Sequence, residues 1–121
     1  MKKIFILFAA TLLALFAFCS CGTDSATLTG TWNLDYETYD GSVAARYSGE
    51  IRWVFTSSTI TVQDRSGASV GNQLEYYVSD GYIYVNDVPQ FEIEELKIKD
   101  MVLRQVIDPL GMDHEFYFTK L

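Results

Sequence analysis

Hydrophobic and polar residues alternate along much of the chain after residue 27, and this period of two is typical of β-strands that bury one face. The alternation is clearest in residues 32–39, where Trp32, Leu34 and Tyr36 are separated by polar residues. Further strands are predicted from alternation or from runs of β-branched and aromatic residues, and they span residues 43–56, 59–63, 73–78, 82–86, 91–98, 101–107 and 115–121.

Turn signals separate these strands. The Asp-Gly pairs at residues 40–41 and 80–81 are typical of two-residue hairpins. The Ser-Gly pair at 48–49 predicts a bend within a long strand, and the phase of the apolar residues slips at 94–95, which predicts a β-bulge. Residues 87–89 contain a proline and are predicted to interrupt the ladder.

No segment after residue 21 keeps the 3.6-residue period of an amphipathic helix over ten residues. Eight or nine short strands joined by tight turns therefore predict an all-β, antiparallel meander. Within about 95 residues, a sheet of this kind removes its edges by closing on itself. We expect a small up-and-down barrel, or a flattened barrel, of about eight strands.

The first residues follow a different pattern. Two lysines precede a mostly apolar run over residues 4–18, which is typical of a secretory signal peptide and is shorter than the ~20 residues that span a bilayer. Ser20 is the small residue before Cys21, an order that resembles the lipobox of bacterial lipoprotein signals. We expect cleavage before Cys21 and its lipidation with acyl chains such as palmitate. The alternative is a plain N-terminal membrane anchor.

The rival lipid acceptor, Cys19, follows the bulky Phe18, which argues against it. We therefore divide the chain into a signal peptide over 1–20, a short polar tether over 21–27 and a β-domain over 28–121. Because both cysteines lie outside the β-domain, we expect it to form no disulfide and no cysteine-based metal or catalytic site.

Residues 21–121 carry seven basic and sixteen acidic side chains, which gives them a net charge of −9. A surface this acidic repels the phosphates of nucleic acids and anionic lipid headgroups. We expect no nucleic-acid partner. The acidity itself is compatible with a cationic or neutral partner and with ordinary solubility.

Only one histidine is present, His114, and it lies between Asp113 and Glu115. Imidazole titrates near neutral pH, so a metal ligand or a general base is one interpretation. Successive strand residues point to opposite faces, however, so these three side chains cannot converge on one metal ion. We interpret His114 as a turn residue at the start of the last strand.

Carboxylates in the polar phase of the strands are the other candidates for catalysis. They are Asp35, Glu37, Glu92 and Glu94. We predict that they lie on a solvated outer face rather than act as a catalytic pair. No serine or cysteine stands in a recognisable nucleophile motif either, so we expect no enzymatic activity, no cofactor and no metal site.

Aromatic residues are numerous for a domain of this size. They either fill the core or line an apolar pocket whose phenol hydroxyls orient a ligand, and the sequence leaves both interpretations open. The side chains predicted to contact a ligand are Tyr36, Trp53, Tyr76, Tyr82 and Tyr84.

Gly30 and Trp32, at the head of the first strand, resemble the Gly-x-Trp signature of lipocalins. The order of the later segments is similar to that of the short lipocalin-like domains found on lipoproteins of Gram-negative bacteria. These segments are an aromatic strand ending at 55–56, an aromatic Asp-Gly hairpin, residues 96–103 and the closing residues 116–118. The resemblance covers about residues 28–121, and it implies that a late basic side chain, Arg104 or Lys120, covers the indole of Trp32.

The resemblance also implies a barrel that binds a small apolar molecule. We therefore expect a non-enzymatic lipoprotein of the cell envelope, anchored through lipid on Cys21 at the outer membrane and facing the periplasm or the cell surface. The alternative is an accessory or assembly lipoprotein whose outer surface contacts another envelope protein. Shorter strands than those of full-size lipocalins imply a shallower cavity.

Overall fold

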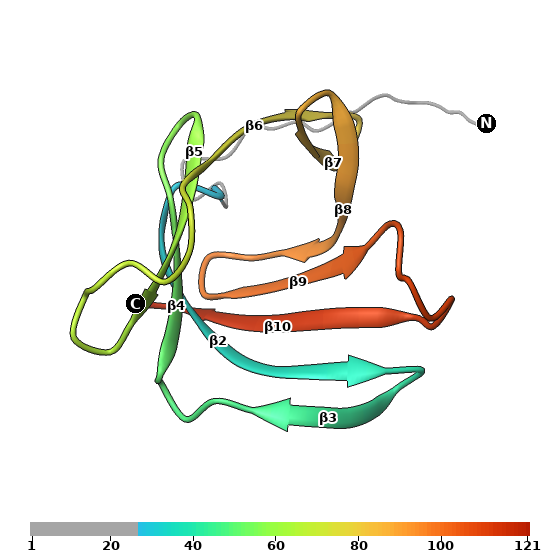
Figure 1. Cartoon of the computed structure of the whole chain (residues 1–121), viewed down its shortest axis with the longest axis horizontal. Coiled ribbons are helices and arrows are strands. Elements are labelled where there is room, and N and C mark those ends of the chain that lie inside the picture. Colours follow the sequence, from blue (N-terminus) through green and yellow to red (C-terminus); the bar gives the residue numbers. More distant parts are fainter. Residues whose placement is uncertain (1–26) are drawn as a thin grey trace.

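The computed structural model describes residues 27–121, which form nine β-strands and no helix (Figure 1). The strands are β2 (Gly30–Tyr39), β3 (Ser42–Arg46), β4 (Ile51–Phe55), β5 (Thr59–Asp64), β6 (Leu74–Ser79), β7 (Tyr82–Val85), β8 (Val88–Leu96), β9 (Asp100–Gln105) and β10 (His114–Lys120). The all-β class predicted from the alternation is confirmed.

The sheet closes into a barrel because its last strand pairs with its first. β10 lies between β9 and β2, so eight of the nine described strands, all except β3, form a closed antiparallel barrel. The extra strand, β3, pairs only with β2. The first half of β2 pairs with β4 and the second half with β3, and Figure 1 shows β4 and β5 turning away from the layer of β9, β10, β2 and β3. The predicted small antiparallel barrel is confirmed.

Several turns and one bulge lie where the sequence predicted them. Asp40 and Asp80 have φ of 50° and 53°, and the glycine after each also has a positive φ, as two-residue hairpins require. The predicted bend at 48–49 separates β3 from β4. The predicted bulge in β8 is confirmed by a shift of register between Ile93 and Glu95.

The connection between β7 and β8 differs from the prediction. Residues 87–89 do not interrupt the ladder, because Asn86 and Asp87 form a third two-residue hairpin, with φ of 54° and 62°. Asn and Asp adopt this left-handed conformation more readily than most other side chains. Pro89 is tolerated inside β8 because the register of β7 and β8 shifts next to its partner, Tyr84.

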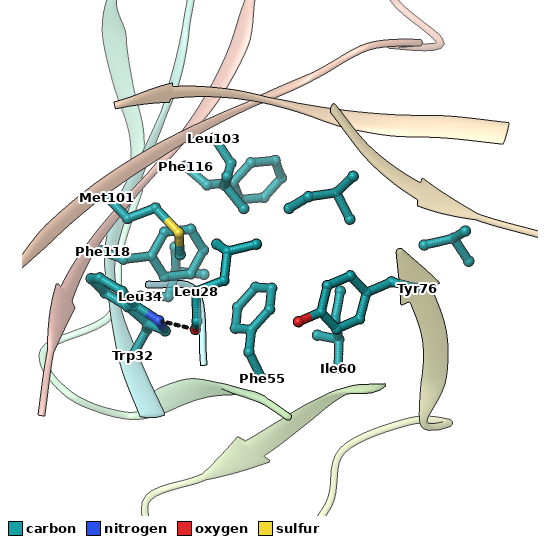
Figure 2. Packing of buried hydrophobic residues seen from close by; sticks show 12 residues of the cluster. Leu28, Trp32, Leu34, Phe55, Ile60, Tyr76, Met101, Leu103, Phe116 and Phe118 are labelled. Atoms are coloured by element: carbon teal, nitrogen blue, oxygen red, sulfur yellow. Dashed lines mark hydrogen bonds between the residues drawn. The ribbon is translucent and has the colours of Figure 1, made fainter. Parts of the chain in front are cut away.

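A continuous hydrophobic core lies inside the barrel (Figure 2). Its buried members are Leu28, Trp32, Leu34, Phe55, Ile60, Tyr76, Ile83, Val85, Met101, Leu103, Phe116 and Phe118. Burying a side chain of this kind typically stabilises a fold by about 1.5–3 kcal/mol. We call the end of the barrel where Leu28 packs beside Trp32 the covered end (Figure 2). We call the opposite end, where β2 ends at Tyr39 and β10 begins at His114, the open end, because Ile51 and Trp53 on that side of the core are only partly buried.

The shortest junction of the barrel lies between β5 and β6. Only two residue pairs join these strands, and the second of them is Ile60–Leu74. Beyond this point β5 is covered by the loop that follows it, since the amide of Val70 donates to the carbonyl of Val62 at 2.7 Å. A junction with so few ladder bonds is expected to open more easily than the rest of the barrel.

Residues 1–26 lie outside the part of the chain that the structure describes. The signal peptide, the lipidation of Cys21 and the tether therefore stay predictions. Among the described residues, no helix is long and apolar enough to cross a membrane.

Candidate functional site

Trp32 is completely buried at the covered end of the barrel. Its indole Nε1 donates a hydrogen bond to the carbonyl of Leu28 at 2.9 Å (Figure 2), and the ammonium of Lys120 lies 5.2 Å from the ring centroid. The prediction that a late basic side chain covers this tryptophan is confirmed for Lys120, whereas Arg104 pairs with glutamates elsewhere. Gly30 makes room for the lysine, since a Cβ there would lie 2.6 Å from Cε of Lys120.

Trp53 is the centre of an aromatic cluster inside the barrel. Its ring centroid lies 5.0 Å from that of Phe118, 5.5 Å from that of Phe91 and 5.6 Å from that of Phe116, in tilted or edge-to-face arrangements. Trp53 pairs with Trp32 across β4 and β2, so both indoles share the interior face. Trp53 is only partly buried, so part of its interior-facing side chain stays accessible to solvent.

The five side chains predicted to contact a ligand are divided between the two faces of the sheet. Trp53 and Tyr76 point inwards and pack with the core. Tyr82 and Tyr84 point outwards, because they alternate with the two buried residues of β7. Tyr36 also points outwards and stacks on a tyrosine of β10. The five therefore do not line one pocket, and ligand contact stays a prediction for the two inward-facing residues.

A β-bulge at Asp35 decides which face the second half of β2 presents. The register of β2 and β10 shifts here, so Tyr36 points outwards and its ring centroid lies 4.5 Å from that of Tyr117. Glu37 consequently points inwards, and only 16% of its side chain is exposed. The prediction that Glu37 lies on a solvated outer face is therefore wrong, because a shift of one residue reverses the face of the residues that follow.

Glu37, Tyr47 and His114 form a hydrogen-bonded group at the open end of the barrel. His114 Nε2 lies 2.7 Å from one carboxylate oxygen of Glu37, and the Tyr47 hydroxyl donates to the other. This hydrogen bond to a carboxylate, together with burial, raises the pKa of Tyr47 to about 12. On the other side of the imidazole, Nδ1 lies 3.6 Å from a carboxylate oxygen of Asp108 and has no hydrogen-bond partner within residues 27–121.

His114 is buried, so its interpretation as a turn residue is wrong. It is the first residue of β10, it is 6% exposed, and its ring centroid lies 4.2 Å from that of Tyr39 and 4.3 Å from that of Phe116. The carboxylates beside it, Glu37 and Asp108, are remote in the sequence or belong to the preceding loop. In the part of the chain that the structure describes, no group of three or more His, Cys, Asp or Glu side chains is placed to hold a metal ion.

A groove of about 660 Å³ lies at the rim of the open end, beside the loop that joins β9 to β10. Val106 and Met112 give it apolar walls. Asp108 shapes the loop, because one of its carboxylate oxygens accepts hydrogen bonds from the amides of Leu110 and Met112, both at 3.0 Å. The other oxygen faces His114, so Asp108 connects the groove to the interior of the barrel.

Arg104 joins two glutamates of β8 on the outer face. Its guanidinium donates to Glu92 at 3.0 Å and lies 3.3 Å from Glu94. Glu94 and Glu115 share a hydrogen bond between their carboxyl groups, which together with burial raises the pKa of Glu94 to about 7 and lowers the pKa of Glu115. The Tyr117 hydroxyl also donates to Glu115, at 2.9 Å. Glu92 and Glu94 thus lie on the outer face, as predicted.

No protein-family model matches this chain, and no curated protein matches it either. Solved structures do match. A lipocalin-like protein from Bacteroides uniformis ATCC 8492 has a TM-score of 0.58 and 16% sequence identity, over 78% of this chain and 98% of that one. An uncharacterised protein from Bacteroides eggerthii DSM 20697 has the same TM-score and 19% identity, over 78% of this chain and all of the other. The fold is lipocalin-like.

The candidate site of this lipocalin-like barrel is the interior near its open end. Apolar side chains there, such as Ile51, Trp53 and Phe91, are packed against the core but only partly buried. Glu37 and His114 face the same interior and add a small number of polar atoms. An apolar wall with a few fixed polar groups is the usual composition of a small-molecule site.

Proposed function

We propose that this protein is a membrane-anchored envelope lipoprotein whose lipocalin-like barrel binds a small apolar molecule without catalysing a reaction. The anchor is supported by the N-terminal sequence, an apolar signal over residues 4–18 followed by Ser20 and Cys21. Acyl chains contribute about 0.8 kcal/mol per buried methylene, so two or three chains hold a domain durably at a membrane.

One observation supports ligand binding: Trp53 and Phe91 face the interior of the barrel but are only partly buried. At the covered end the same face is sealed, and Trp32, Phe55 and Met101 are at most 1% exposed. Removing apolar surface from water is favourable by about 25 cal/mol per Å². An apolar ligand that enters at the open end and packs on Trp53 and Phe91 would be stabilised by the burial of apolar surface on both sides of the contact.

The polar side chains at the open end determine which head group the apolar ligand can carry. Glu37 presents a carboxylate to the interior on one side of His114, and the carboxylate of Asp108 lies on the other side of the imidazole. A ligand carboxylate would be repelled by these two groups, whereas a hydroxyl, amide or amine can donate to Glu37. The ligand is therefore an apolar body with a neutral or donating head group.

The experiment is a titration of the chain beginning at Gly22 with the neutral apolar fluorophore N-phenyl-1-naphthylamine, followed by the rise in probe fluorescence. The nine strands and the core that the structure describes lie within residues 28–121, so this chain retains them. We expect saturable binding, and Trp53→Leu should weaken it by about tenfold or more, as expected for a central aromatic contact. The outward-facing Tyr82→Leu is the matched control and should bind as the wild type does. Equal affinity for wild type and Trp53→Leu would contradict the proposal.

The alternative, an accessory or assembly lipoprotein, is favoured by a different observation. The loop between β9 and β10 exposes two large apolar side chains, since Ile107 is 64% and Leu110 is 73% exposed. Exposed apolar surface of this kind is typical of protein contacts when it forms a larger patch. Under this alternative, replacing both residues by serine abolishes crosslinking to an envelope partner and leaves binding of the apolar probe unchanged.

A further inference from the structure

A second hollow, of about 490 Å³, lies on the outer side of the β6–β7 hairpin, next to the turn between β4 and β5. It is lined by three tyrosines, two acidic residues, a serine and an asparagine, and by no basic residue. Two of its tyrosines, Tyr77 and Tyr84, point away from the barrel interior. This hollow is therefore separate from the open-end site of the proposed function.

An aromatic platform forms one wall of the hollow. Tyr77 and Tyr84 lie directly opposite each other on β6 and β7, with ring centroids 4.9 Å apart and planes inclined by only 4°. Tyr77 remains 47% exposed despite its size. Its hydroxyl donates to the carboxylate of Asp87 at 3.3 Å, which links the platform to the hairpin turn at the end of β7.

The opposite side of the hollow is held in place by Tyr76. Its amide donates to the carbonyl of Ser58 at 2.9 Å, and its hydroxyl donates to the carbonyl of Thr56 at 2.5 Å. The side chain is buried, with 8% exposed. Tyr76 thus joins β6 to the turn between β4 and β5 where the β5–β6 ladder is short. These two hydrogen bonds hold the two sides of the hollow at a fixed distance from each other.

The charge of the hollow is uncompensated. Glu75 and Asp87 both line it, and within residues 27–121 neither of them takes part in an ion pair. A positive group here is attracted by two features of the hollow. The carboxylates attract its charge, and the negative face of each aromatic ring adds a cation–π interaction. An anion is repelled here, and a neutral apolar molecule gains nothing from the carboxylates.

We propose that this hollow binds a small organic cation, whose ammonium group lies against the Tyr77–Tyr84 platform and between the carboxylates of Glu75 and Asp87. The aromatic wall favours an alkylated ammonium over a metal ion, because a metal ion needs oxygen ligands that the ring faces do not supply. The hollow, with a volume of about 490 Å³, has room for a small organic cation. The site does not depend on an apolar ligand in the barrel.

Calorimetric titration of the full chain, in micelles of an uncharged maltoside detergent, tests the proposal with choline as the probe. The neutral isostere 3,3-dimethylbutan-1-ol has the same shape without the charge. We expect saturable binding of choline and at least about tenfold weaker binding of the isostere. Failure of choline to saturate, or equal binding of the isostere, overturns the proposal.

A pair of matched variants locates the site. Asp87 and Asp80 are both turn residues with positive φ, 62° and 53°, at the two ends of β7, and only Asp87 lines the hollow. Asparagine keeps the backbone preference and the acceptor for Tyr77 in both turns. Asp87→Asn should weaken choline binding by about threefold to tenfold, and Asp80→Asn should not. Equal effects of the two variants would mean that choline senses only the net charge of the protein, which overturns the proposal.

Trp53→Leu should leave choline binding unchanged, so failure of this site and failure of the apolar site are distinguishable.

Discussion

Replacing Gly30 by alanine should destabilise the barrel through the contact between Lys120 and Trp32. Gly30 has a φ of 139°, a backbone conformation that residues with a side chain rarely adopt. The added Cβ would lie 2.6 Å from Cε of Lys120. Because this is far inside van der Waals contact, the flexible lysine has to move away from the indole that its ammonium now covers at 5.2 Å.

Three contributions set the size of the effect. Backbone strain of this kind costs about 1–3 kcal/mol. The displaced ammonium loses a cation–π contact worth about 0.5–1 kcal/mol at a partly exposed site. Alanine also restricts the unfolded chain more than glycine does, which offsets about 0.4–1 kcal/mol. The free energy of unfolding should therefore fall by roughly 1–3 kcal/mol, and each 1 kcal/mol lowers the Tm of a domain of this size by about 4–8 °C.

Urea denaturation of the wild type, Gly30→Ala, Lys120→Ala and the double variant separates these contributions. In the Lys120→Ala background the new Cβ meets no lysine, so only the backbone strain remains. Gly30→Ala should then cost about 0.5–1 kcal/mol less than in the wild type. Strict additivity of the two substitutions, or no loss of stability in Gly30→Ala, would refute this reasoning.

Two further predictions concern the outer acidic group and the N-terminus. The pKa of Glu94 is raised from 4.5 to about 7, so its contribution to stability is complete below its unfolded pKa and is lost as pH rises through about 7. The lowered pKa of Glu115 acts in the opposite sense, and its contribution is lost only at acidic pH. Glu94→Gln should therefore flatten the fall in Tm between about pH 5 and 8 while Glu95→Gln retains it, and an unchanged profile in Glu94→Gln would contradict the assignment. Cys21→Ser should abolish incorporation of labelled palmitate in growing cells and Cys19→Ser should not, so a labelled Cys21→Ser protein would rule out that acceptor.

Local turn chemistry could be predicted from the sequence because it depends on a few adjacent residues. The Asp-Gly pairs at 40–41 and 80–81 specify the left-handed backbone of a two-residue hairpin without reference to the rest of the fold. The slip of hydrophobic phase at 94–95 likewise predicts the bulge in β8. The Asn-Asp turn at 86–87 carries a weaker signal of the same kind, and the nearby Pro89 obscured it.

The bulge at Asp35 could not be predicted, and it changes the candidate site. The alternation of Trp32, Leu34 and Tyr36 continues through it without a break. The shift arises from pairing with β10 at the far end of the chain, where Tyr117 opposes Tyr36 and the next residue opposes Leu34. A single unpaired residue then moves Tyr36 out of the interior and Glu37 into it.

His114 shows the same limit in another form. Its neighbours in the sequence cannot converge with it, as the strand geometry predicts. Its actual partners are Glu37 of β2 and Asp108 of the loop before β10, and Glu37 reaches it only because the barrel closes between β2 and β10. Burial of a polar residue on a strand is therefore decided by register and closure, which no short motif encodes.

The most direct test of the proposed function is native mass spectrometry of the chain beginning at Gly22, after exposure to an extract of bacterial lipids and small apolar metabolites. We predict one adduct per chain, with a mass that identifies the ligand. The adduct should persist in Tyr82→Leu and disappear in Trp53→Leu, since Trp53 faces the interior and Tyr82 faces outwards. An unliganded mass for the wild type under gentle conditions would contradict the proposal that the barrel binds an apolar molecule.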